Sequence, residues 1–163
     1  MEMTLRWFGT GFDSVTLENI RQVPGVKGVI TTLYDTMPGD VWSRERIKAM
    51  KKEVEDAGLK LLGIESVNIH DDIKIGNGKR EQYIENYIET LKHLGEENIN
   101  MVCYNFMPIF DWTRSDLAKV RPDGSTVLSY DQELTDKINP NNLKTSMESM
   151  SNGFTLPGWK PER

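Results

Sequence analysis

Cysteine is almost absent from this chain of 163 residues, and charge of one sign does not dominate it. Cys103 is the only cysteine, so no disulfide can form within the chain. The 20 Lys and Arg residues are scattered among 25 Asp and Glu residues, so we expect no nucleic-acid-binding surface. No apolar run is long enough to cross a membrane, and no secretory leader follows Met1. These absences predict a soluble cytoplasmic protein that binds neither nucleic acid nor membrane.

Signatures of several enzyme classes are also missing. Gly9 and Gly11 follow the first predicted strand without the third glycine of a dinucleotide-binding turn. The chain contains neither a phosphate-binding P-loop nor a serine nucleophile elbow. His70 and His93 are the only histidines, and they lie too far apart in sequence to make a metal site by themselves.

What the first hundred residues do contain is an alternation of apolar strands and amphipathic helices. The sequence predicts four short strands, at residues 5–8, 28–33, 61–67 and 101–106. A helix is expected at residues 16–23, a second between the cap Ser43 and the stop Gly58, and a third with an apolar stripe that ends at the stop Gly95. This alternation is typical of a parallel sheet covered by helices.

Two arrangements fit this pattern, a doubly wound open sheet and a (β/α)₈ barrel. Four strands are half of an eight-stranded barrel, which usually needs about 250 residues. Residues 107–163 break the pattern, with a β-hairpin expected within 117–131 around the turn sequence RPDGS. We expect a single partial domain over residues 1–163, in which 1–106 form four βα units and 107–163 form an insertion with a hairpin and an irregular tail.

Polar side chains at the predicted carboxyl ends of the strands are the candidates for chemistry, because sites in parallel sheets gather there. The four strand ends carry Arg6 and Trp7, Tyr34 and Asp35, Glu65 and His70, and Tyr104 and Asn105.

His70 lies in the richest of these loops. It is a candidate proton donor or hydroxyl-binding group, since imidazole changes charge near neutral pH. The alternative is a loop histidine that is hydrogen-bonded to Asp71 or Asp72. Glu65 lies within a strand, where a buried carboxylate needs a partner, either a metal or Arg6.

Arg114 stands near Trp112 in the insertion, where its guanidinium suits the carboxylate of an acid sugar. The alternative is an arginine that ties the insertion to the sheet through Asp111 or Asp116. We expect Cys103 to be inert core packing within its strand. His93 is expected to be solvated near the end of its helix, where its interaction with the helix dipole is favourable.

Blocks from end to end of the chain resemble mannonate dehydratases, in the order found in that family. The longest is residues 102–117 (VCYNFMPIFDWTRSDL). The others are residues 6–9 (RWFG), 39–42 (GDVW), 64–67 (IESV), 69–74 (IHDDIK), 122–125 (PDGS) and 156–159 (LPGW). Any single block is weakly specific, whereas together they are highly specific.

The resemblance implies a xylose-isomerase-like (β/α)₈ barrel, of which this chain is the first half. It implies a lyase that converts D-mannonate into 2-dehydro-3-deoxy-D-gluconate and water in hexuronate and glucuronate breakdown, with Mn²⁺ or Fe²⁺ as cofactor. The family's metal-binding motifs do not occur here, and Cys103 is not the family's metal cysteine. We therefore expect no metal ligand in this chain and no activity of the chain alone.

On this interpretation His70 is the catalytic candidate at the first-half rim of the site. The candidate substrate contacts are Arg6, Trp7, Tyr104, Asn105, Trp112 and Arg114. Their individual roles are inferred from position and are not part of the family signature. Two alternatives remain, a non-catalytic half-barrel that forms a homo-oligomer, and a sugar isomerase or epimerase on the same barrel.

Overall fold

The computed structural model describes residues 1–104, 106 and 114–137 of the chain. The chain divides into two compact units, Met1–Pro108 and Ile109–Arg163. The second unit begins two residues after the predicted start of the insertion at residue 107. A single partial domain over the whole chain stays a prediction, and each unit is described by itself.

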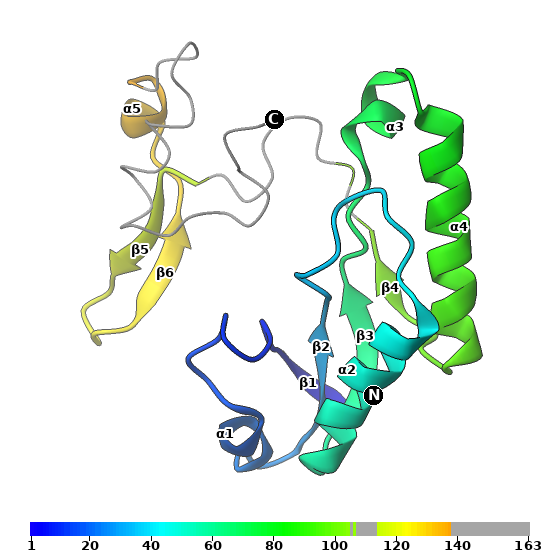
Figure 1. Ribbon diagram of the computed structural model, residues 1–163. Helices are drawn as coiled ribbons and strands as arrows, with labels where there is room; N and C mark the ends of the chain where they lie inside the picture. The colour runs from blue at the N-terminus through cyan, green and yellow to red at the C-terminus, as the bar shows by residue number, and fades with distance from the viewer. Residues whose placement is uncertain (105, 107–113, 138–163) are drawn as a thin grey trace. The chain divides into compact units, whose positions relative to one another are not determined.

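Four parallel strands form the sheet of the first unit (Figure 1). They are β1 (Met3–Arg6), β2 (Val26–Thr31), β3 (Lys60–Glu65) and β4 (Val102–Cys103). Each strand pairs with the next in the order β1-β2-β3-β4, which confirms the predicted parallel α/β sheet. β1 and β2 begin two residues earlier than predicted, and β4 is shorter than predicted.

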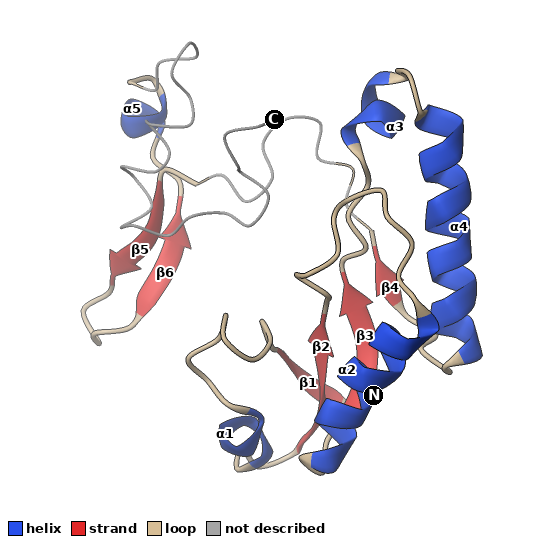
Figure 2. Cartoon of the chain, viewed as in Figure 1, coloured by secondary structure: helices blue, strands red, loops and turns tan. Residues whose placement is uncertain are grey.

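Helices connect consecutive strands of the first unit (Figure 2). They are α1 (Leu17–Arg21), α2 (Arg44–Asp56), α3 (Asp71–Ile75) and α4 (Arg80–Glu96). α1 packs on β2, and α2 packs on both β3 and α4. Crossovers between parallel strands are right-handed as a rule, and with strands in sequential order this rule places the connecting helices on one face of the sheet. Within the described residues, none of the helices is long and apolar enough to cross a membrane.

Side-chain caps explain where the helices begin and end. The hydroxyl of Ser43 accepts a hydrogen bond from the backbone N–H of Arg46 at 3.3 Å, as the sequence predicted for the start of α2. Gly58, with φ +78°, follows the end of α2 in the left-handed conformation. The prediction that Gly95 ends α4 is wrong. The helix continues through Gly95, and the left-handed residue is Asn98, with φ 61°.

The core of the first unit lies between the helices and the helix-covered face of the sheet. Val29 on β2 and Ile64 on β3 have no exposed surface. Ile47 and Val54 on α2 and Leu94 on α4 are equally buried. Each aliphatic side chain of this kind contributes roughly 1.5–3 kcal/mol when it is fully buried. The sheet and helix positions that shape the site therefore belong to one packed layer.

Cys103 is exposed, and its predicted place in a packed core is wrong. Within the described residues, β4 pairs with β3 alone and forms an edge of the sheet. Glu65 is paired in register with Cys103, and its side chain is also largely exposed. A strand side chain is buried only where a second layer packs over it, and the described residues provide none at this point.

The second unit contains an antiparallel hairpin and a short helix. These elements are β5 (Asp116–Val120), β6 (Thr126–Ser129) and α5 (Gln132–Thr135). In the turn, the N–H of Arg121 donates to the carbonyl of Ser125 at 2.8 Å, and Gly124 takes the left-handed conformation with φ +82°. The hairpin spans residues 116–129 and so begins one residue before the range 117–131 in which the sequence predicts one.

Candidate functional site at the carboxyl ends of the strands

An ion pair joins the carboxyl ends of β1 and β3 across the intervening strand β2. Nε of Arg6 lies 3.5 Å from Oε2 of Glu65. The register pairs Arg6 with Ile30, which neighbours Val29 in β2. Because alternate strand residues face opposite sides, Arg6 lies on the face opposite the buried Val29. Of the two partners considered for Glu65, the structure shows Arg6.

The guanidinium of Arg6 is held on several sides. Nη1 donates to the carbonyls of Trp7 and Ile30, and Nη2 donates to the hydroxyl of Tyr34 at 2.9 Å. The same group lies 4.6 Å from the centroid of the Phe8 ring, a cation–π distance. A guanidinium has five N–H donors. One N–H of Nη2 is therefore left without a partner among the described residues.

Tyr34 is a site residue that sequence reasoning named only as a strand-end position. Its oxygen accepts the hydrogen bond from Arg6, and its ring lies 4.9 Å from the ring of Phe12. Burial raises the pKa of the Tyr34 phenol above its ordinary value, with Arg6 acting in the opposite direction. The phenol is therefore protonated at neutral pH. Its proton has no acceptor among the described residues and is available to a ligand.

Trp7 follows Arg6 directly, but its indole lies in the core. Only 3% of Trp7 is exposed, and it lines a hollow together with Leu17 of α1 and Ala57 at the end of α2. Residues that follow one another along a strand direction face opposite sides. The structure therefore does not bring the side chains of Arg6 and Trp7 into one site, although the sequence grouped them. A substrate role for Trp7 stays a prediction without geometric support.

His70 caps α3, a five-residue helix that the sequence did not predict. Nδ1 of His70 accepts a hydrogen bond from the backbone N–H of Asp72 at 3.0 Å. The histidine is thus bonded to Asp72, as one of the two interpretations held, although through the backbone. With Nδ1 occupied as an acceptor, the proton of the neutral ring lies on Nε2, so the ring offers a hydrogen-bond donor there.

The imidazole of His70 stacks on an aromatic ring of α4. Its centroid lies 3.8 Å from that of Tyr83, with 24° between the planes. Both rings line a small hollow beneath the loop between β2 and α2, which contributes Gly39 and Asp40, while Asn68 contributes from the loop after β3. The ring plane of His70 is therefore fixed by packing as well as by its cap hydrogen bond.

The remaining predicted contacts follow β4 in the chain. Tyr104 follows β4 and is 70% exposed. Arg114 is also exposed and belongs to the second unit. Asn105 and Trp112 lie outside the described residues. The substrate-binding roles of these four residues stay predictions.

The described residues do not form a metal site. Across residues 1–104, 106 and 114–137, no three His, Cys, Asp or Glu side chains are grouped closely enough to hold an ion. Glu65, the carboxylate that the sequence offered as a metal ligand, is paired with Arg6. Nδ1 of His70 accepts the hydrogen bond from the N–H of Asp72. What this part of the molecule offers a ligand is hydrogen-bond donors, from Arg6, Tyr34 and His70.

Comparison with known proteins aligns the whole chain with one enzyme family. The family model described as D-mannonate dehydratase (UxuA) matches residues 1–163. Curated mannonate dehydratases from Brachyspira hyodysenteriae and Geobacillus thermodenitrificans are 72% and 53% identical to the chain over 163 residues. A crystal structure of mannonate dehydratase from Streptococcus suis serotype 2 matches 92% of the chain, with a TM-score of 0.80 and 44% identity.

These relatives are considerably longer than the chain. The chain spans 46% of the Brachyspira protein and 44% of the Geobacillus protein. It covers 42% of the Streptococcus chain. The similarity thus extends over all of this sequence and over less than half of each relative.

Proposed function

This chain belongs to the D-mannonate dehydratase family, and from that premise we propose that it forms part of a lyase that converts D-mannonate into 2-dehydro-3-deoxy-D-gluconate and water. The reaction belongs to hexuronate and glucuronate breakdown. The family match over residues 1–163 carries this proposal and favours it over a sugar isomerase or epimerase. The sparse use of cysteine supports a cytoplasmic location.

The fold proposed for such an enzyme is a (β/α)₈ barrel of the xylose-isomerase type, to which this chain contributes the first four βα units. The sequential order β1-β2-β3-β4 supports it. In a doubly wound sheet the strand order reverses at a switch point, whereas a barrel keeps strands in chain order with all helices outside. The length of the relatives is consistent with four further units.

Arg6 and Tyr34, which are hydrogen-bonded to each other at the strand ends, support binding of a hydroxylated carboxylate. Dehydration removes the proton beside the carboxylate and expels a hydroxyl group, so donors are needed at both groups. The N–H of Arg6 that has no partner among the described residues is one donor for the carboxylate, and the phenol proton of Tyr34 is a donor for a neighbouring hydroxyl. A ligand carboxylate competes with Glu65 for Arg6, since Glu65 lies 3.5 Å from Nε.

His70 is proposed as the catalytic side chain of this half of the site. Nε2–H is a donor for a substrate hydroxyl, and the hydrogen bond at Nδ1 fixes which nitrogen faces the ligand. Tyr104 and Asn105, which follow β4, and Trp112 and Arg114, which follow later in the chain, are proposed as further contacts.

The resemblance implies a divalent cation, Mn²⁺ or Fe²⁺, which stabilises negative charge next to the substrate carboxylate when it is bound. The described residues do not form a site for that ion. Their proposed part in the reaction is to orient the carboxylate and the hydroxyls.

Two assays test the proposal. A chain of the relatives' full length that carries this sequence is incubated with D-mannonate and Mn²⁺, and formation of the 2-keto acid is followed. We expect turnover, and we expect Arg6→Lys to reduce it while Arg80→Lys, a change at an exposed arginine that begins α4, does not. Activity on a ketose without dehydration of D-mannonate contradicts the proposal.

The second assay uses the 163-residue chain itself under the same conditions. We expect no turnover, because the described residues lack a metal site. Metal-dependent dehydration by this chain would show that the cation-binding residues lie within it, contrary to the proposal.

Self-association is a second candidate property, favoured by apolar side chains at both edges of the sheet. Met3 and Leu5 on β1 are 58% and 38% exposed, and Met101 beside β4 is 42% exposed. Unpaired strand edges with apolar neighbours favour association with another copy. Size-exclusion chromatography with light scattering should then show a dimer or larger species, and a well-folded monomer argues against it.

A further inference from the structure

One side of α4 carries four side chains that contact the loop between β2 and α2. Tyr83, Asn86, Thr90 and His93 follow one another at steps of three, four and three residues. Side chains at these steps lie on the same face of a helix. We refer to these four residues as the α4 row. Its contacts with the loop are made at Gly39 and Trp42.

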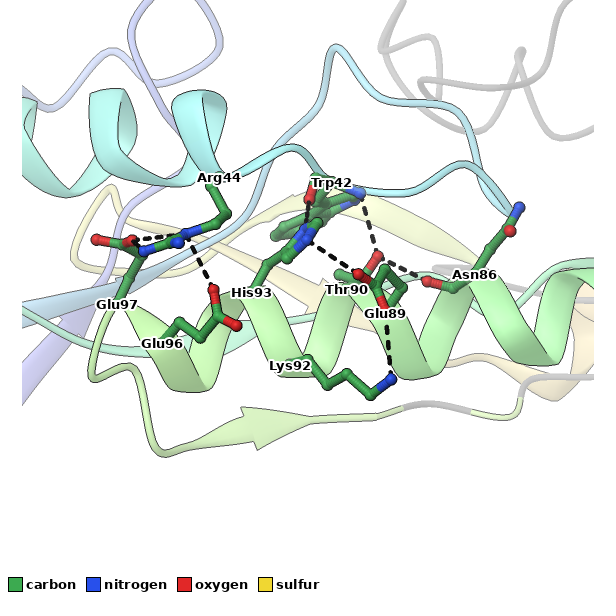
Figure 3. A network of polar contacts seen from close by, with 9 residues as sticks. All are labelled: Trp42, Arg44, Asn86, Glu89, Thr90, Lys92, His93, Glu96 and Glu97. Carbon is green, nitrogen blue, oxygen red and sulfur yellow. Dashed lines mark hydrogen bonds and ion pairs between the residues drawn. The ribbon is translucent and has the colours of Figure 1, made fainter.

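Two members of the α4 row hold the backbone of Trp42 (Figure 3). The hydroxyl of Thr90 accepts a hydrogen bond from the N–H of Trp42 at 3.1 Å, and it donates to the carbonyl of Asn86 at 3.0 Å. Nδ1 of His93 lies 2.7 Å from the carbonyl oxygen of Trp42. Both backbone polar groups of this buried residue are therefore satisfied by side chains of α4.

His93 is bonded on both sides of its ring, and the prediction that it is solvated is wrong. Only 20% of its side chain is exposed, and Nε2 lies 3.3 Å from Oε1 of Glu89, which also pairs with Lys92. The carbonyl of Trp42 and the carboxylate of Glu89 can only accept hydrogen bonds. The two contacts together fix the orientation of the ring between the loop and α4.

Asn86 holds the same loop at Gly39, close to His70. Its Nδ2 donates to the carbonyl of Gly39 at 2.7 Å. A Cβ at Gly39 would lie 2.6 Å from Cδ1 of Tyr83 and 3.0 Å from Cδ2 of His70. The backbone of Gly39 is thus seated directly on the stacked pair of rings, with no room for a side chain.

We propose that the α4 row positions His70. The row holds the loop at Gly39 and Trp42, Gly39 presses on the edge of the His70–Tyr83 stack, and Tyr83 supports the imidazole face. The cap hydrogen bond at Nδ1 restrains one atom of the ring, whereas the stack and Gly39 set its plane. Asn86, Thr90 and His93 are positioning residues that act through this loop. The inference rests on the proposed function, in which His70 contacts the substrate.

NMR on the 163-residue chain tests this without substrate. Long-range ¹H–¹⁵N correlations report the ring nitrogens of His70, and we expect the pattern of a ring protonated on Nε2. In Asn86→Ala and in Thr90→Val, the His70 ring signals should shift or broaden, because Gly39 is released from the stack. Glu85→Ala, an exposed change on the same helix, is the control and should leave them unchanged.

Replacement of His93 separates positioning from general support of α4. His93→Leu should perturb the His70 signals, and His93→Asn should restore them in large part, because an amide N–H can occupy the place of Nδ1–H.

Amide exchange at Trp42 should accelerate about tenfold in Thr90→Val, as expected when a buried hydrogen bond of this kind is lost.

His70 ring signals that match wild type in folded Asn86→Ala and Thr90→Val overturn the proposal, even if exchange at Trp42 accelerates. Should Asn86→Ala fail to fold, Asn86→Asp keeps the side-chain size while removing the donor, and the same criterion applies. Failure of the full-length protein to dehydrate D-mannonate would count against the proposed function and would leave the spectra unaffected, so the two outcomes are distinguishable.

Discussion

Two buried threonines of the first unit differ in whether the hydroxyl has a partner. Thr31 is 1% exposed, and its hydroxyl has no hydrogen-bond partner within the described part of the chain, whereas Thr90 is fully buried and bonds to Trp42. An unsatisfied buried polar group costs about 1–3 kcal/mol. We expect Thr31→Val to raise the free energy of unfolding by about 1 kcal/mol and Thr90→Val to lower it by about 1–2 kcal/mol. Urea unfolding measures both, and equal effects contradict the assignment.

Tyr34 should titrate in the alkaline range. Burial raises the pKa of its phenol above the ordinary value of 10.0, so the protonated form is favoured in the folded state. The contribution of this phenol to the free energy of unfolding is fully present below the pKa of the phenol in the unfolded chain. It is lost as the pH rises through the higher pKa of the folded protein. Ultraviolet titration should show a late-ionising component that Tyr34→Phe removes. Tyr130→Phe, at a 64% exposed position, should leave that component in place.

The sequence located the single residues of the site and offered Arg6 as one partner of Glu65, but it did not indicate the partner of Tyr34. Arg6, Tyr34 and Glu65 were all found at strand ends, because apolar runs and following turns mark those ends. Nothing in the local sequence indicates that Arg6 bonds to Tyr34, since 28 residues separate them. The core position of Trp7 follows from strand alternation, a rule that the grouping of Arg6 with Trp7 did not apply.

At the scale of elements, the end of α4 is tied to the start of α2. Nη2 of Arg44 lies 2.7 Å from Oε1 of Glu97, and Nε lies 3.1 Å from Oε2 of Glu96 (Figure 3). The hydrogen bond from Arg44 holds the pKa of the Glu97 carboxyl below its ordinary value of 4.5. The stability from this pair is therefore present above the pKa of the unfolded carboxyl and is lost as pH falls through the lower folded value.

Glu97→Gln should accordingly lower the urea midpoint at pH 7, and the difference from wild type should shrink as the pH is lowered below that range. Glu85→Gln, at an exposed position of α4, is the matched control and should change little at either pH. A Glu97→Gln difference that grows on acidification contradicts the assigned role of the Arg44 pair.

Gly39→Ala tests the close approach of the loop to α4. The added methyl group would meet the rings of Tyr83 and His70, and the residue has φ +93°, which favours glycine. We expect a loss of about 1–3 kcal/mol in the free energy of unfolding. Gly11→Ala, with a similar φ but open space around the position, controls for the backbone cost alone. Equal losses in the two variants contradict the close approach.

Elements with a strong local signal were predicted well, and those without one were not. α2 begins after Ser43 and ends before Gly58, as expected, because a capping residue and a left-handed glycine are visible in the local sequence. α3 buries none of its residues, so it has no apolar stripe to reveal it. The end of α4 at Asn98 rather than Gly95 depends on the path of the chain into β4, which lies outside the helix itself.

At the scale of the whole molecule, the apolar core found among the described residues lies in the first unit. All buried hydrophobic residues identified in the described structure lie between Trp7 and Ile99, and Ser115 is the one buried residue identified in the second unit. A chain cut to residues 1–108 should therefore unfold cooperatively and keep the His70 ring signals of the longer chain. Loss of both would show that the first unit depends on the second.

The alternation of strands and helices predicted the parallel sheet, because the spacing of apolar residues and the turn residues between elements are local properties of the sequence. Which strands form the edges, and therefore whether Cys103 is covered, depends on the number of strands that pair, and no single segment encodes that number.

The exposed thiol on β4 gives the protein a unique attachment point. A maleimide dye reacts at Cys103 alone, because the chain has no other cysteine. That dye would stand opposite Glu65 in the register, beside the ion pair that a sugar acid is proposed to disturb. Fluorescence from an unmutated chain can then follow ligand entry in real time, and air oxidation of unlabelled chains can reveal whether two such edges meet.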